Sequence, residues 1–137
     1  SSAEGTIKAL CGMGVPYGIA RLMQAEDRQV ALRIFLLDNS ASTSALDGTF
    51  LMPPEDSGQP WSKARCSRWE ETMRMAMQQA EWNAKVGTPC EFFLLNPPSR
   101  KEGGFRQGVD FARIDALQGD EVQQRMELRN MLMATGP

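Results

Sequence analysis

The sequence contains no histidine among its 137 residues. This absence excludes histidine general bases, Ser-His-Asp and Cys-His nucleophile arrangements, and every zinc site that needs an imidazole ligand. Cysteine is also scarce: Cys11, Cys66 and Cys90 lie far apart, without a CxxC pair and in odd number. A disulfide framework or a cysteine-rich metal site needs more cysteines at closer spacing. We therefore expect reduced thiols in an intracellular compartment, either the cytoplasm or an organelle reached after removal of a leader.

An excess of positive charge is missing as well. The 15 Lys and Arg residues against 17 Asp and Glu residues give a net charge of −2, and no basic cluster stands out. Proteins that bind the phosphate backbone of nucleic acids normally have a positively charged face, so we expect no nucleic-acid partner. No apolar run approaches the ~20 residues needed to cross a bilayer, so we also expect no membrane span. Hydrophobic residues make up 42% and charged residues 23% of the chain, which is typical of a folded globular domain.

The first part of the chain predicts a helical lead-in over residues 1–29, followed by an α/β domain over residues 30–137. Residues 6–11 and a second segment after Pro16 place apolar side chains at helical spacing. Residues 30–37 form a nearly continuous apolar run, which predicts a central strand covered on both faces. The polar loop after this strand leads into a Gly-, Pro- and Asp-rich stretch that ends near Pro60, and we predict a long surface loop there.

The second part predicts a helix, two strands and a last helix. Ser67 opens an S-x-x-E capping box, and Trp69 begins an apolar stripe along the helix that follows. Residues 90–95 form the next predicted strand, and residues 109–114 alternate in the way an edge strand does. Asp120 is the predicted N-cap of the last helix. A strand, a crossover helix and a second strand make a βαβ unit, so we predict parallel pairing with a right-handed crossover.

One group of polar residues directly follows the first strand. Asp38, Ser40 and Ser42 occupy alternate positions just past its carboxyl end, at the edge where open parallel sheets bind ligands. A carboxylate and two hydroxyls offer hard oxygen donors, which suit Mg²⁺ or Mn²⁺ better than zinc or copper. The simpler alternative is that these residues terminate the strand and cap neighbouring amides.

Residues 34–42, Ile-Phe-Leu-Leu-Asp-Asn-Ser-Ala-Ser, resemble the opening of a von Willebrand factor A-type (vWA) domain. In that family a hydrophobic first strand runs into D-x-S-x-S, the first part of the metal-ion-dependent adhesion site (MIDAS). By element order the resemblance covers roughly residues 31–132, and it implies a Rossmann-like open, mainly parallel sheet flanked by helices. It further implies that Ser40 and Ser42 ligate a divalent cation and that Asp38 acts directly or through water. In that family the open coordination position of the cation takes an acidic group from a protein partner, and the resemblance implies the same for this chain.

The chain departs from the family pattern at two points. Ala41 stands where the family usually has glycine between the two serines. The family also completes its site with a later threonine and aspartate, and nothing after Leu132 is long enough to supply them. The resemblance thus implies the N-terminal portion of a vWA domain, ending after the third strand and its helix. A single carboxylate holds a hard cation weakly; Asp47 is a possible substitute acid, although Asp-Gly is more typical of a plain turn.

These features support a non-enzymatic protein-binding module of the vWA type that acts within a multiprotein assembly. The alternative is a structural or accessory subunit whose metal site is vestigial and metal-free. Both hypotheses expect other protein subunits as partners. Trp61 is a candidate partner anchor, because exposed tryptophan is favoured in interface hot spots, but it could equally fold back onto the sheet. A hydrolase or phosphotransferase using Asp38 is the third hypothesis, and it lacks a recognisable base, nucleophile or phosphate loop.

Overall fold

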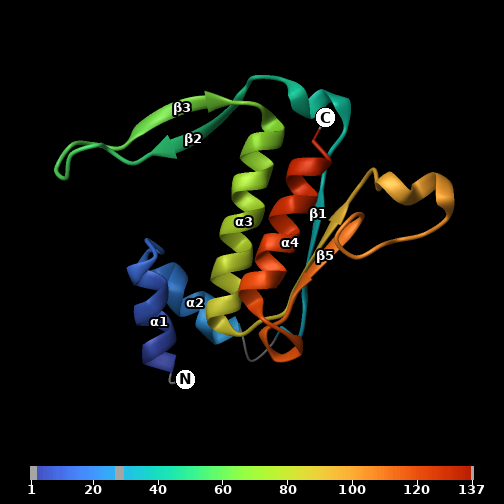
Figure 1. Cartoon of the computed structure of the whole chain (residues 1–137). Coiled ribbons are helices and arrows are strands. Elements are labelled where there is room, and N and C mark those ends of the chain that lie inside the picture. The colour runs from blue at the N-terminus through green and yellow to red at the C-terminus, as the bar shows by residue number, and fades with distance from the viewer. Residues whose placement is uncertain (1–2, 27–29, 137) are drawn as a thin grey trace.

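The fold is described from a computed structural model, which covers residues 3–26 and 30–136. Its helices and strands follow one another in this order (Figure 1): α1 (Ala3–Gly12), α2 (Tyr17–Glu26), β1 (Arg33–Leu37), η1 (Ala41–Ser44), β2 (Gly48–Met52), β3 (Ser62–Cys66), α3 (Arg68–Val86), β4 (Cys90–Leu94), η2 (Pro98–Glu102), β5 (Phe111–Ile114), η3 (Ala116–Gln118) and α4 (Glu121–Ala134). The α/β class is therefore confirmed. The predicted boundary between lead-in and domain, at residues 29 and 30, borders a stretch that lies outside the described residues.

The main sheet has the strand order β1-β4-β5. β1 and β4 are parallel, with Arg33 opposite Cys90 and Leu37 opposite Leu94, so the predicted parallel pair around the α3 crossover is confirmed. β5 is an edge strand, as predicted, but it pairs with β4 in the antiparallel direction. A loop, and no crossover helix, joins β4 to β5, which allows the chain to reverse direction. The sheet is therefore small and mixed, whereas the sequence predicts a mainly parallel one.

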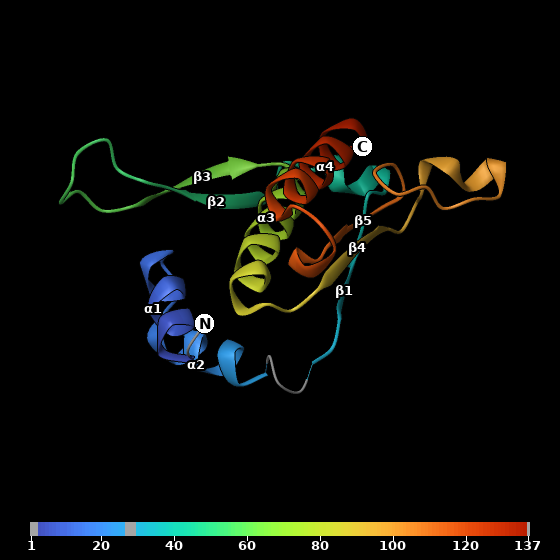
Figure 2. The same cartoon turned by 60° about the horizontal axis from the view of Figure 1, so that its bottom comes forward.

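Helices α3 and α4 lie together on one face of this sheet (Figures 1 and 2). The buried side chains between the layers include Leu37, Phe92 and Ile114 from the strands, and Trp69 and Leu128 from the helices. They occupy alternate positions along each strand, because successive side chains point to opposite faces of a sheet. The main core is thus a two-layer packing of helices on one sheet face.

The prediction that β1 is a central strand covered on both faces is wrong. β1 stands at the edge of the described sheet, and Ile34 and Leu36 are 59% and 66% exposed. The helices in the described residues contact the opposite face, where Leu37 is buried. An apolar run shows that a strand can be buried on both faces, but it does not show whether this chain supplies the cover for both.

Residues 48–66 form an antiparallel hairpin, β2–β3, where the sequence predicts an irregular loop. The base of the hairpin is fastened to α3: the Arg74 guanidinium lies 3.7 Å from the centre of the Phe50 ring. Gly48 also approaches the helix closely, since a Cβ atom there would lie 2.7 Å from the Ser67 carbonyl oxygen. The far end projects away from the rest of the molecule in both views (Figures 1 and 2). The sequence does not predict these two short strands, because the prolines and the glycine between them indicate an irregular loop.

Capping residues set the ends of the long helices. The Ser67 hydroxyl accepts a hydrogen bond from the Glu70 amide at 3.1 Å, and Asp120 accepts one from the Val122 amide at 2.9 Å. Both N-caps are predicted from the sequence. Gly87 ends α3 in the left-handed region, with φ of 81°, a conformation that costs glycine little. Across residues 3–26 and 30–136, we find no helix with the length and apolar character needed to cross a membrane.

Helices α1 and α2 pack against each other and form a second, smaller core. Leu10, Val15, Ala20 and Met23 are buried there together with Val86, which lies at the C-terminal end of α3. This cluster contains none of the buried residues of the main core. The lead-in therefore packs on the α/β part at the end of α3, and an ion pair of 2.8 Å between Glu26 of α2 and Arg33 of β1 adds a second contact.

Replacing Trp69 with alanine should lower the free energy of unfolding by about 3 kcal/mol, because a buried aromatic side chain leaves a cavity when it is removed. Trp69 is buried between α3 and the sheet. The matched control is Trp61→Ala, which removes an exposed indole and should change stability by less than about 0.5 kcal/mol. Urea denaturation followed by circular dichroism measures both; similar values for the two variants would contradict the core described here.

Candidate functional site

The carboxyl ends of β1 and β4 meet at one edge of the sheet, and side-chain amides connect the loops that follow them. The Asn39 amide donates to the Asn96 carbonyl oxygen at 2.9 Å, and the Asn39 Oδ1 accepts from the Asn96 N–H at 2.8 Å. The Leu95 N–H also donates to the Leu37 carbonyl oxygen at 2.9 Å. The loop that carries the predicted metal ligands is therefore held against the neighbouring strand.

Asp38, Ser40 and Ser42 lie close together at this edge. The Ser40 N–H donates to Asp38 Oδ1 at 2.9 Å, and the hydroxyl oxygens of Ser40 and Ser42 are 3.0 Å apart. The buried Thr43 holds the turn from inside, because its hydroxyl donates to the Ser40 carbonyl oxygen at 2.6 Å. The structure thus brings together the three side chains that the sequence groups by alternation.

The Asp38 carboxylate is kept ionised by its neighbour. Hydrogen bonds from the Ser40 side chain and then from the Ser40 backbone lower the pKa of Asp38 below its usual value. An ordinary aspartate is already charged at neutral pH, and the lowered pKa keeps Asp38 charged into more acidic solution as well, so that it favours a nearby cation there too. The simpler interpretation, in which these residues terminate the strand and cap neighbouring amides, predicts the same hydrogen bonds. The geometry therefore agrees with both the metal site and the strand-terminating caps.

The spacing of the two hydroxyls fits a hard cation. Adjacent ligands of an octahedral Mg²⁺ at about 2.1 Å are about 3.0 Å apart, and the Ser40 and Ser42 oxygens have that separation. A hydroxyl–hydroxyl hydrogen bond has nearly the same length. Within residues 3–26 and 30–136, no three His, Cys, Asp or Glu residues gather into a possible metal site. The donor set therefore suits Mg²⁺ or Mn²⁺ in kind, with one carboxylate to hold it.

Asp47, the possible substitute acid, is engaged elsewhere. Arg68 donates to Asp47 Oδ1 at 2.6 Å and to Oδ2 at 2.5 Å. This two-point pair lowers the pKa of Asp47 and raises that of Arg68, chiefly through the hydrogen bonds between them. Asp47 would have to leave Arg68 in order to ligate a cation.

Trp61, the candidate partner anchor, directly precedes β3 in the projecting hairpin and is 62% exposed. The alternative that it folds back onto the sheet is therefore wrong. The Asp38 group follows β1, whereas Trp61 belongs to the hairpin fastened to α3. The two predicted contact points are thus carried by separate parts of the fold.

The cysteines are free thiols, and two of them are unsuited to nucleophilic chemistry. Burial raises the pKa of the Cys90 thiol to about 12. Burial also raises the pKa of Cys66, with a further contribution from the nearby Glu70 carboxylate. Because the thiolate is the reactive form, neither residue is an activated nucleophile.

Asp110 is a buried carboxylate that the sequence does not single out. Its Oδ1 accepts from the Ser99 N–H at 2.8 Å and its Oδ2 from the Arg106 N–H at 2.7 Å. Burial alone would raise the pKa of Asp110, but the hydrogen bonds from these two amides outweigh it and the pKa lies below its usual value. Both oxygens are used to close the loop around η2, so the role of Asp110 is structural.

The Asp110→Asn substitution should cost about 1–2 kcal/mol at pH 7, because one amide donor keeps only an uncharged oxygen acceptor and the other faces the NH₂ group of asparagine. The folded-state pKa of Asp110 is depressed, so its contribution to stability is present above the unfolded-state pKa and is lost as the pH falls through the folded-state value. The wild type should therefore lose more stability than Asp110→Asn between pH 7 and pH 3. Urea denaturation at both pH values measures this, with the exposed Asp56→Asn as control; equal losses would contradict it.

Comparison with family models, with curated proteins and with solved structures finds no match in any of the three. The vWA resemblance therefore rests on the D-x-S-x-S residues and on the order of the elements in this chain.

Proposed function

We propose that the chain is a non-enzymatic protein-binding module, similar to vWA domains, that acts within a multiprotein assembly. In this proposal the edge formed by Asp38, Ser40 and Ser42 binds an acidic group of a partner subunit through Mg²⁺ or Mn²⁺. The observation that carries it is the convergence of three oxygen-bearing side chains on a loop that Asn39 ties to the neighbouring strand. Free thiols agree with a reducing intracellular compartment.

The bound cation would supply a positive point that a partner carboxylate can ligate. Ser40 and Ser42 would provide two adjacent oxygen ligands, since their spacing matches neighbouring octahedral positions. Asp38 would balance part of the charge, directly or through water, and it already orients Ser40 through the backbone N–H. Trp61 offers a second, apolar contact point on the hairpin.

A specific observation also favours the metal-free alternative, a structural or accessory subunit. Asp38, Ser40 and Ser42 already satisfy one another by hydrogen bonds, and the donor set contains one carboxylate. Charge count largely determines how tightly a hard cation is held. The two candidates therefore differ in one measurable property, the affinity for Mg²⁺ or Mn²⁺.

An enzyme that uses Asp38 is the weaker hypothesis. Its carboxylate is hydrogen-bonded to Ser40 and has a lowered pKa, which disfavours a role as general base. The chain also has no histidine to activate a nucleophile. Turnover of a phosphate ester or anhydride that Asp38→Asn abolishes would revive this hypothesis.

Titration with MnCl₂ should show weak binding to the wild type, with a dissociation constant on the order of 1 mM. Asp38→Ala should weaken it at least tenfold, because the site loses its one negative charge. Ser44→Ala is the matched control: its hydroxyl donates to the Ala41 carbonyl oxygen and stands outside the D-x-S-x-S group. Water-proton relaxation of Mn²⁺ measures all three. Absence of binding by the wild type would leave the metal-free subunit.

A further inference from the structure

No helix covers the face of the sheet opposite α3 and α4 in the described structure (Figures 1 and 2), and most of the side chains on this face are apolar. Strand register arranges them in two rows that cross all three strands. One row consists of Leu36, Phe93 and Phe111, and the other of Ile34, Glu91 and Arg113. Parallel strands are almost always covered on both faces, so this uncovered sheet face is a candidate docking surface.

Aromatic rings make up much of the surface. The rings of Phe93 and Phe111 stack with their centres 5.3 Å apart, and Phe105 meets Phe93 edge-on at 6.3 Å. Phe105 comes from the loop before β5 and is 62% exposed. Together with Ile34 and Leu36, which are 59% and 66% exposed, these rings form a contiguous apolar surface, a feature that on a soluble protein commonly marks an interaction site.

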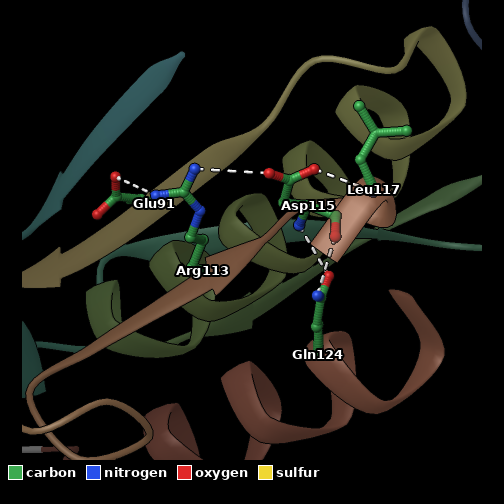
Figure 3. A network of polar contacts seen from close by, with 5 residues as sticks. All are labelled: Glu91, Arg113, Asp115, Leu117 and Gln124. Carbon is green, nitrogen blue, oxygen red and sulfur yellow. Dashed lines mark hydrogen bonds and ion pairs between the residues drawn. The ribbon is translucent and has the colours of Figure 1, made fainter. Parts of the chain in front are cut away.

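Charges of both signs lie side by side in the second row. The Arg113 guanidinium is placed between Glu91 and Asp115, 3.5 Å from an oxygen of each (Figure 3). Charge-assisted hydrogen bonds are normally about 2.7–2.9 Å long, so both ion pairs are loose. The buried Arg113 Nε has no hydrogen-bond partner. The Arg113 side chain is 38% exposed and that of Glu91 16%, so the row presents a partly exposed cation on β5 next to a more covered anion on β4.

We propose that a second copy of this chain covers the uncovered sheet face, in a dimer with two-fold symmetry. Two sheets that meet face to face are related by an axis lying between them. An axis parallel to the strands and centred on β4 would place Glu91 against Glu91, which is repulsive. An axis shifted to run between β4 and β5 places Glu91 of each copy against Arg113 of the other. The same axis places Phe93 of each copy against Phe111 of the other.

The shifted axis also gives β1 a place to pack. Leu36 lies one strand spacing outside β4, in the row of Phe93 and Phe111. Gln107 forms an isolated β-bridge with Phe111. It therefore lies next to β5, on the side away from β4, in the same row as Phe111. The axis therefore brings Leu36 against the 105–109 loop of the other copy, where Phe105 is exposed.

The area suits a weak, reversible dimer. Six strand residues and Phe105 from each copy are fewer than the roughly 20–30 residues that each partner contributes to a standard interface, so the dimer should be weak. The dimer does not depend on the cation proposed at Asp38, because Asp38 lies beyond the end of β1 and outside both rows.

Sedimentation velocity of the full chain tests the dimer. The mass should rise from 15.2 kDa towards twice that value as the concentration increases from about 5 to 500 µM. Leu36→Asp should keep the wild-type circular dichroism spectrum and remain monomeric. The matched control is Leu51→Asp, an exposed strand leucine on the hairpin, which should dimerise as the wild type does. A wild type that stays at 15.2 kDa, or a Leu36→Asp variant that still dimerises, overturns the proposal.

A mixture of charge variants tests the axis. Glu91→Lys and Arg113→Glu should each be monomeric, because each homodimer would contain two like-charge contacts. Mixed in equal amounts they should form a heterodimer, since both contacts across the axis become Lys–Glu or Arg–Glu pairs. Within each variant, positions 91 and 113 carry like charges before and after mixing. Recovery of the dimer on mixing therefore reports on the contact between the two copies. Folded variants that stay monomeric when mixed overturn this arrangement; if either is unfolded, the Leu36→Asp comparison decides.

Discussion

The parallel pairing of β1 with β4 is the constraint on which the rest of the structure depends. Because α3 carries the chain back along the sheet, both strands end at the same edge, and Asn39 can bond to both backbone groups of Asn96. The same crossover places α3 on one face, where α4 joins it. The polar edge with Asp38 and the uncovered sheet face are thus two results of a single βαβ unit.

Local signals in the sequence predict much of this fold. The Ser67 capping box and the Asp120 N-cap each follow from a few neighbouring residues, and the parallel pairing of β1 with β4 follows from the order strand, helix, strand. The β2–β3 hairpin escapes prediction because its strands are five residues each, are joined by a proline-rich turn, and are held by a tertiary contact between Phe50 and Arg74. The exposure of one face of β1 is not predicted either, because burial depends on what covers a strand as well as on the strand's own side chains.

The candidate site is predictable to a similar degree. The alternation of Asp38, Ser40 and Ser42 indicates that they converge, and the structure brings them together. The sequence cannot reveal that Asn39 and Asn96, which are 57 positions apart, bond to each other. Nor does it show that Asp110 accepts two amides of its own loop, since an aspartate between valine and phenylalanine reads as part of a strand.

The division into two hydrophobic cores has a consequence for how the chain comes apart. The α1–α2 pair buries its own small set of side chains, and it contacts the rest of the fold at the end of α3 and through the Glu26–Arg33 ion pair. Regions that bury few apolar groups open with a smaller free energy than the whole domain. We therefore expect the amide hydrogens of α1 and α2 to exchange with solvent through a local opening, whereas those of β4 should exchange only on global unfolding. The chain should then unfold as two cooperative units of unequal stability.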